Sequence, residues 1–198
     1  LTYAKVNLGT GSLIKRGSGT WHLGGASSTR TGNTIVWAGT LRGNADNSLG
    51  SGDITVNGGA FYLYGASQNA ATVTVTNTGS VLVYNNGSIR KLNATSFIIN
   101  SDSPTSIEPV LADLNGSTHA TLTKSGSGTL TLKGDNTYTG STSISSGTMI
   151  LGNGFTTGSI ASTSAISIAS GATLAYNLSS YTDSVSYTHL TLPTILLV

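Results

Sequence analysis

Few side chains in this chain could do acid, base or metal chemistry. The 198 residues hold seven Asp and Glu, three His and no Cys. Carbohydrate-cleaving sites need two or three clustered carboxylates, or carboxylates that bind calcium beside a basic residue. The lack of cysteine excludes thiolate metal sites and disulfides. Any catalytic residues must therefore be sought among the acids.

Three acids lie close together in the chain, in a segment that also holds two prolines. Asp102, Glu108 and Asp113 fall within residues 93–121, and neighbouring carboxyls can serve as general acid and base. A carbohydrate-active site in this segment is one hypothesis for function. The simpler interpretation is that these are solvated loop acids.

No other residue pattern predicts a site. His119 has no second histidine at metal-ligand spacing, and His22, between Trp21 and Leu23, is expected to face solvent. The serines lack a nearby histidine and acid, and glycine-rich strings such as 17–19 precede no helix. We therefore predict that the chain is not an enzyme and has no catalytic, metal-binding or cofactor-binding residue.

The composition excludes several function classes. Gly, Ser, Thr and Asn make up about half of the chain, and only 8% of residues are charged, against about 25% in ordinary globular proteins. Disordered chains combine low hydrophobicity with high net charge, whereas this chain is 37% hydrophobic with a net charge of +2. The few basic residues form no cluster for nucleic acid. No apolar run of about 20 residues predicts a membrane-spanning helix.

Glycine followed by a small residue recurs along the chain at intervals of 19, 20 or 24 residues within each half. The glycines are Gly19, Gly39, Gly59, Gly79, Gly128, Gly147 and Gly171. Two positions after them stand Trp21, Leu41, Phe61, Val81, Leu130, Met149 and Thr173. Six of these seven are apolar, which indicates a repeated strand with one buried face.

A second alternating run precedes several of these glycines, at 54–56, 73–75 and 166–168. The repeated unit is thus strand, short turn, strand, as in one coil of a parallel β-solenoid. We expect an all-β fold, a parallel β-helix of 19–24-residue coils, with roughly ten coils stacked at about 4.8 Å. Residues 93–121 fit this repeat poorly and are expected to form an irregular coil or a loop excursion. An antiparallel sandwich or barrel is the alternative fold.

Three tyrosines are candidate surface-binding residues. Phe61 and Leu63 are expected to point inward, so Tyr62 and Tyr64 should point outward, with Tyr84 aligned one coil after Tyr64. Exposed aromatic side chains on a rigid sheet can bind sugar rings or another protein. The alternative is that they only stabilise the outer face of the sheet.

Residues 122–153 read LTKSGSGTLTLKGDNTYTGSTSISSGTMILGN, and a weaker copy occupies residues 13–44. This string resembles the autotransporter-associated strand repeat found in the passenger regions of bacterial type V secreted proteins. Met149 stands where the repeat usually has leucine, and the Asn-Thr-Tyr-Thr-Gly segment is degraded in the first copy. The resemblance extends, with degenerate coils, over most of residues 1–180.

The resemblance implies a right-handed parallel β-helix that is exported and displayed at the bacterial cell surface. It further implies a C-terminal β-barrel translocator and a signal peptide elsewhere in the full-length protein, and a non-catalytic role as stalk or adhesin. The ligand would be an unidentified surface glycan or protein. Self-association through the strand edges of the end coils is an alternative partner.

The last residues break the pattern. Residues 185–198, VSYTHLTLPTILLV, contain no Gly or Asn, and part of this string resembles a translated sequencing-adapter junction. We therefore expect residues 1–184 to form the repeat region and residues 185–198 to be a non-native tail.

Overall fold

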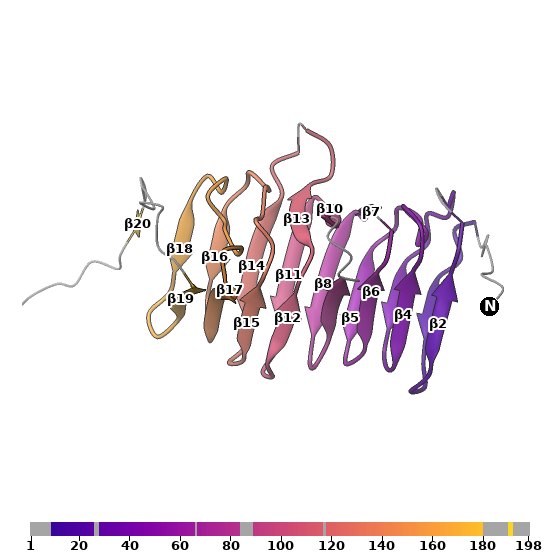
Figure 1. Ribbon diagram of the computed structural model, residues 1–198, viewed down its shortest axis with the longest axis horizontal. Coiled ribbons are helices and arrows are strands. Elements are labelled where there is room, and N and C mark those ends of the chain that lie inside the picture. The colour runs from indigo at the N-terminus through magenta and orange to yellow at the C-terminus, as the bar shows by residue number, and fades with distance from the viewer. Residues whose placement is uncertain are drawn as a thin grey trace, which may run out of the picture.

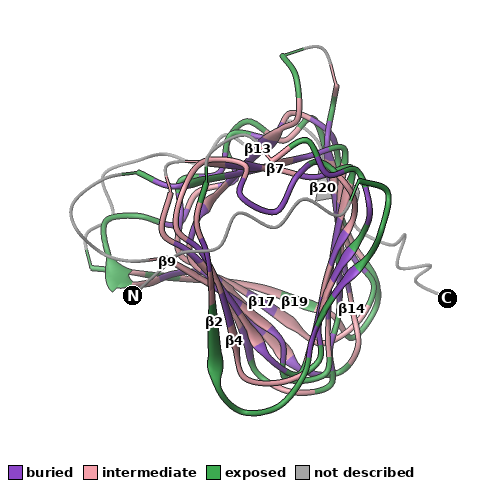
Figure 2. Ribbon diagram, turned by 90° about the vertical axis from the view of Figure 1, so that its right-hand side faces the viewer, coloured by how far each residue is buried: buried purple, intermediate pink, exposed green. Residues whose placement is uncertain are grey.

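The computed structural model describes residues 9–25, 28–65, 67–83, 89–116, 118–179 and 190–191. All regular secondary structure in these residues is β-strand. Figure 1 shows the strands in a row of stacked coils that runs from β2 (Thr20–Leu23) at one end to β18 (Ile166–Ile168) near the other. Seen end-on in Figure 2, the coils superimpose on a common three-sided outline.

Sheet 1 consists of nine strands. In spatial order they are β1 (Leu13–Lys15), β3 (Thr34–Val36), β5 (Ile54–Asn57), β8 (Thr72–Thr76), β11 (Ser96–Asn100), β14 (Thr121–Ser125), β16 (Thr142–Ile144), β18 and β20 (Leu190–Thr191).

Sheet 2 contains eight strands and sheet 3 contains three. Sheet 2 has the order β2, β4 (Thr40–Gly43), β6 (Ala60–Leu63), β9 (Ser80–Val83), β12 (Thr105–Ile107), β15 (Thr129–Leu132), β17 (Thr148–Phe155) and β19 (Thr173–Leu178). Sheet 3 has the order β7 (Ser67–Asn69), β10 (Lys91–Ala94) and β13 (Val110–Asp113).

Equivalent strands of successive coils pair in parallel, which confirms the all-β solenoid. Ile54 pairs with Val73, and Ser96 pairs with Thr121, so a coil spans between 19 and 25 residues. Every strand pair among the described residues is parallel, and the antiparallel sandwich or barrel is therefore wrong. There are about eight turns rather than ten, because several coils are longer than twenty residues.

The core is a set of inward columns, each built from one position of successive coils. Leu41, Phe61 and Val81 are register partners in sheet 2 and have no exposed surface. Val56 and Val75 form the corresponding column in sheet 1 and are equally buried. Each apolar side chain therefore covers the one in the next coil, which a single coil could not do alone.

Residues 93–121 are more regular than the sequence indicates. Strand β11 pairs in register with β8 on one side and β14 on the other. The coils here reach 24 and 25 residues because β10 and β13 add a strand on sheet 3, and the expected repeat of about twenty residues therefore misses them. The only departure from strand and tight turn is the loop between β13 and β14, which projects from the row of coils in Figure 1.

Two positions of the predicted apolar series differ from expectation. In β19 the residue that pairs with Met149 is Leu174, not Thr173, and Leu174 and Tyr176 pack against the core. The Gly-small anchor is thus shifted by one residue in that coil. Trp21 is in register with Leu41 but is 46% exposed, because β2 is the edge strand of sheet 2.

Residues 185–198, expected to be a non-native tail, lie outside the described residues except for the backbone of β20.

Candidate functional site

Two of the three candidate tyrosines lie on the outer face of sheet 2. Tyr62 alternates with the buried Phe61 and Leu63 in β6, and Tyr64 follows the strand; both tyrosines are half-buried. Tyr84 lies outside the described residues.

Arginine 42 joins the two tyrosines. Arg42 is the register partner of Tyr62, and its guanidinium carbon lies 5.5 Å from the Tyr62 ring centroid and 4.9 Å from that of Tyr64. A guanidinium at such distances is attracted by the negative face of an aromatic ring. We refer to Arg42, Tyr62 and Tyr64 as the arginine–tyrosine cluster; the sequence reasoning had identified its aromatic members but not Arg42.

Histidine 22 extends this surface by one coil. His22 is the register partner of Arg42, and its Nδ1 lies 3.5 Å from the Asn44 side-chain amide. Its side chain is half-buried rather than fully solvent-facing. Register alone could have predicted this outward row of His22, Arg42 and Tyr62, because the three residues are twenty positions apart.

All six acids of the described residues are used to join coils. Each carboxylate accepts a hydrogen bond from the backbone N–H of a residue in a neighbouring coil, over 2.8–3.1 Å. The pairs are Asp46 with Ser67, Asp53 with Thr72, Asp102 with Ser127, Glu108 with Val83, Asp113 with Thr139 and Asp135 with Gly158. The carboxylates therefore satisfy backbone donors at the turns, where the sheet ladders end.

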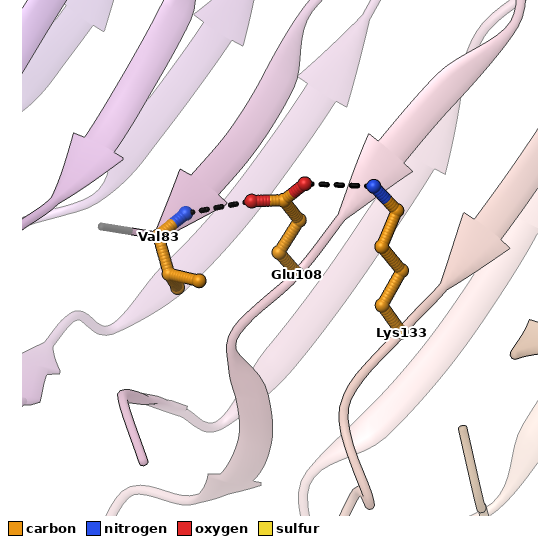
Figure 3. Close-up of polar contacts among 3 residues, drawn as sticks. All are labelled: Val83, Glu108 and Lys133. Carbon is orange, nitrogen blue, oxygen red and sulfur yellow. Dashed lines mark hydrogen bonds and ion pairs between the residues drawn. The ribbon is translucent and has the colours of Figure 1, made fainter. Parts of the chain in front are cut away.

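Glu108 shows this role most clearly (Figure 3). Its Oε2 accepts from the Val83 backbone N–H of the preceding coil at 2.9 Å, and its Oε1 accepts from Nζ of Lys133 in the following coil at 2.7 Å. One side chain thus spans three coils. It is the only ion pair between described residues.

The three acids of residues 93–121 are not brought together into one site. Asp102 lies in the turn between β11 and β12, Glu108 between β12 and β13, and Asp113 at the end of β13. No group of three or more His, Asp or Glu in the described part of the chain is placed to hold a metal ion. The chemistry that clustered carboxylates would supply therefore has no geometric basis there.

Asp113 is part of a polar chain with a hydroxyl and an imidazole. The Thr139 hydroxyl donates to Asp113 Oδ2 at 2.8 Å, and His119 Nδ1 lies 2.7 Å from the same hydroxyl. Burial acts to raise the pKa of Asp113, but hydrogen bonds from Ala120 and Thr139 and the nearby His119 lower it overall. A carboxylate with a lowered pKa is a weak general base near neutrality, so this chain fixes the base of the 114–120 loop.

Two lysines are buried inside the solenoid. Lys15 and Lys124 are 0% and 1% exposed and share the inward face with Leu13 and Leu122, two residues earlier. Each ammonium donates to three backbone carbonyl oxygens at the turn that follows its strand, over 2.6–3.2 Å. Burial lowers the pKa of Lys124. Strand alternation could have predicted this burial from the sequence.

The degraded segment of the first repeat copy has a structural equivalent. In the second copy the buried Tyr138 hydroxyl lies 2.6 Å from the Thr142 hydroxyl. In the first copy the buried guanidinium of Arg30 donates to the hydroxyl of Thr34, also four residues later, and to the Leu49 carbonyl at 2.6 Å. A large polar side chain therefore closes the same corner in both copies.

Stacked parallel coils with buried lysines, small polar turns and a polar outer face define a passenger-type β-solenoid. The passenger-associated-transport-repeat family matches residues 13–42 and 122–151, the two segments in which the buried lysines occur. The chain is also similar to the "Adhesin BmaC autotransporter" of Brucella suis biovar 1 (strain 1330), with 34% identity over 144 residues. This match covers 70% of the chain but 4% of that protein, so the chain spans a small part of its relative. No solved structure matches.

The chain is therefore an autotransporter passenger repeat protein, and this class indicates a position at the bacterial cell surface or outside the cell. None of the described segments is a helix long and apolar enough to cross a membrane.

Proposed function

We propose that this chain is a non-catalytic adhesive segment, a rigid solenoid that presents its outer face to a ligand on another surface. The observation that supports this most strongly is the use of all six described carboxylates as links between coils. A solenoid whose acids hold its turns has its chemistry invested in stiffness.

The arginine–tyrosine cluster is the proposed contact surface. Aromatic and arginine side chains are the residues that most often dominate binding energy at interfaces. The cluster lies on a continuous sheet, so the surface is fixed before the ligand arrives and little conformational entropy is lost on binding. The name of the Brucella relative, an adhesin, supports the same function.

The full-length protein would place this segment at the end of an export route. An autotransporter passenger is carried by a C-terminal translocator, which we propose as the covalent partner of this region in the parent protein. In such a protein, the coils described above would act as spacer and binding surface together.

Adhesion of the purified chain to cultured epithelial cells tests the proposal. Fluorescently labelled chain should bind saturably, and the Tyr62→Ala/Tyr64→Ala variant should lose most of this binding while its thermal unfolding is unchanged. The control is Tyr176→Phe, which alters a tyrosine packed against the core instead of one on the outer face. Equal binding by the chain and its double variant would remove the arginine–tyrosine cluster from the proposal.

A further inference from the structure

The cation of the arginine–tyrosine cluster is not neutralised by the protein. The one ion pair between described residues joins Lys133 and Glu108, and Arg42 is not part of it. The Arg42 Nε is buried without a hydrogen-bond partner. Its interactions are the two aromatic contacts, which hold the guanidinium in place and leave its hydrogen-bonding capacity unused.

The surrounding face contains no acid. The outward positions of β2, β4 and β6 are Thr20, His22, Thr40, Arg42, Ala60 and Tyr62. The next outward acid in the same row is Glu108, which lies beyond Leu82 and is bound to Lys133. A ligand that reaches Arg42 therefore meets positive charge, hydroxyl groups and aromatic rings.

We propose that this surface binds a carboxylated glycan, with the carboxylate on the Arg42 guanidinium and the sugar ring against Tyr62 and Tyr64. This inference rests on the proposed adhesive function and names the class of its ligand. A guanidinium binds a carboxylate through two parallel hydrogen bonds, which an ammonium cannot do. Tyrosine offers an apolar ring for the C–H face of a sugar and a hydroxyl for its edge.

The size of the surface favours a glycan over an acidic protein. The three strands that carry the row span two inter-strand spacings, about 10 Å. A stable protein–protein interface buries about 800 Å² on each partner, which this row does not supply. A short oligosaccharide fits it, and the Thr40 hydroxyl and the Asn44 amide lie within the same face for its neutral hydroxyl groups.

A comparison of three oligosaccharides tests the proposal with the full chain. Sialyllactose, its carboxyl-reduced form and neutral lactose are titrated into the chain by calorimetry at low and high salt. Sialyllactose should bind at least tenfold more tightly than the other two, and its affinity should fall with salt. The variant Arg42→Gln should remove this preference, and Arg42→Lys should restore only part of it.

The matched control is Arg16→Gln. Arg16 also lies over an aromatic ring, that of Trp37 at 5.6 Å, but on sheet 1. This variant should bind sialyllactose like the unmodified chain, and both arginine variants should unfold at the same temperature as that chain. Equal affinity for the reduced and carboxylated sugars, or a preference that survives Arg42→Gln, would overturn the inference. Cell adhesion that persists in Arg42→Gln would leave the proposed function standing and refute only this ligand class, and selective binding of an acidic protein would refute it as well.

Discussion

The Lys124 ammonium occupies the space beside Gly147 in the following coil. A Cβ placed on Gly147 would lie 2.9 Å from Nζ of Lys124 and 2.5 Å from two backbone carbonyl oxygens. The first repeat copy has the same arrangement, in which a Cβ on Gly39 would lie 2.7 Å from Nζ of Lys15. The lysine of the repeat and the glycine of the next coil therefore form one structural unit.

Replacing that glycine should destabilise the solenoid. Gly147 has a φ of +69°, which side-chain-bearing residues rarely adopt, and it lacks space for a methyl group. We expect Gly147→Ala to lower the free energy of unfolding by about 1–3 kcal/mol, measured by urea denaturation. Gly116→Ala is the control, because a Cβ there meets no atom within 4 Å. Equal midpoints for the two variants would contradict this account of the turn.

Removing the buried ammonium should also weaken the fold. Lys124→Met keeps most of the side-chain volume but leaves three carbonyl oxygens, those of Ser125, Gly126 and Ser146, without their donor. The neighbours of Lys124 in the inward column are Ile99 and Ile144, so methionine fits the apolar surroundings. Burial of the charge itself costs free energy, yet unsatisfied buried acceptors cost about 1–3 kcal/mol, and we expect the second effect to exceed the first. A variant as stable as the parent in thermal unfolding would show the opposite balance.

The two functions of Tyr138 can be separated by two substitutions. The ring is buried and tilted against Phe97 with 6.1 Å between centroids, and the hydroxyl is bonded to Thr142. Tyr138→Phe should cost about 1 kcal/mol, the value of one hydrogen bond. Tyr138→Ala should cost about 3–5 kcal/mol, because it also leaves a cavity. Chemical denaturation measures both, and equal losses would mean that packing contributes little.

Stability should fall in acid through the turn carboxylates. The pKa of Asp102 is lowered, chiefly by the backbone hydrogen bond from Ser127, and the pKa of Asp113 is lowered as described above, both from 3.8. The unfolded chain therefore binds more protons than the folded one as the pH drops below about 4. The stabilisation is complete above this value and is lost as the pH falls through the folded pKa values. Thermal unfolding between pH 2.5 and 5 should show a shallower pH dependence in Asp102→Asn/Asp113→Asn, and an unchanged slope would exclude these two groups as its source.

Most of the fold could be predicted from spacing, since a stacked coil repeats its buried positions at nearly constant intervals. Leu41, Phe61 and Val81 could be assigned to one column because each follows a Gly-small pair. The 93–121 coil could not, because an added strand on sheet 3 changes its length without changing its pairing. Thr173 was misplaced for a related reason, a one-residue shift in a turn.

The functional surface could be predicted only in part. Alternation predicts that Tyr62 points outward, but the position of Arg42 over two rings depends on side-chain conformations that periodicity does not encode. The buried Lys15 and Lys124 were missed because a charge is normally assigned to the surface, although their parity matched Leu13 and Leu122. Hydrogen bonds across turns, invisible in a linear sequence, decide where such charges can lie.

The central claim is that the chain binds a surface without cleaving it. Mass spectrometry of glycans on and released from epithelial cells, during saturating incubation with the chain, tests this most directly. We predict retained protein and glycan masses that do not change, for both the chain and its Glu108→Gln variant. Shortened glycans that appear with the chain and disappear with Glu108→Gln would contradict the account and assign catalysis to residues 93–121.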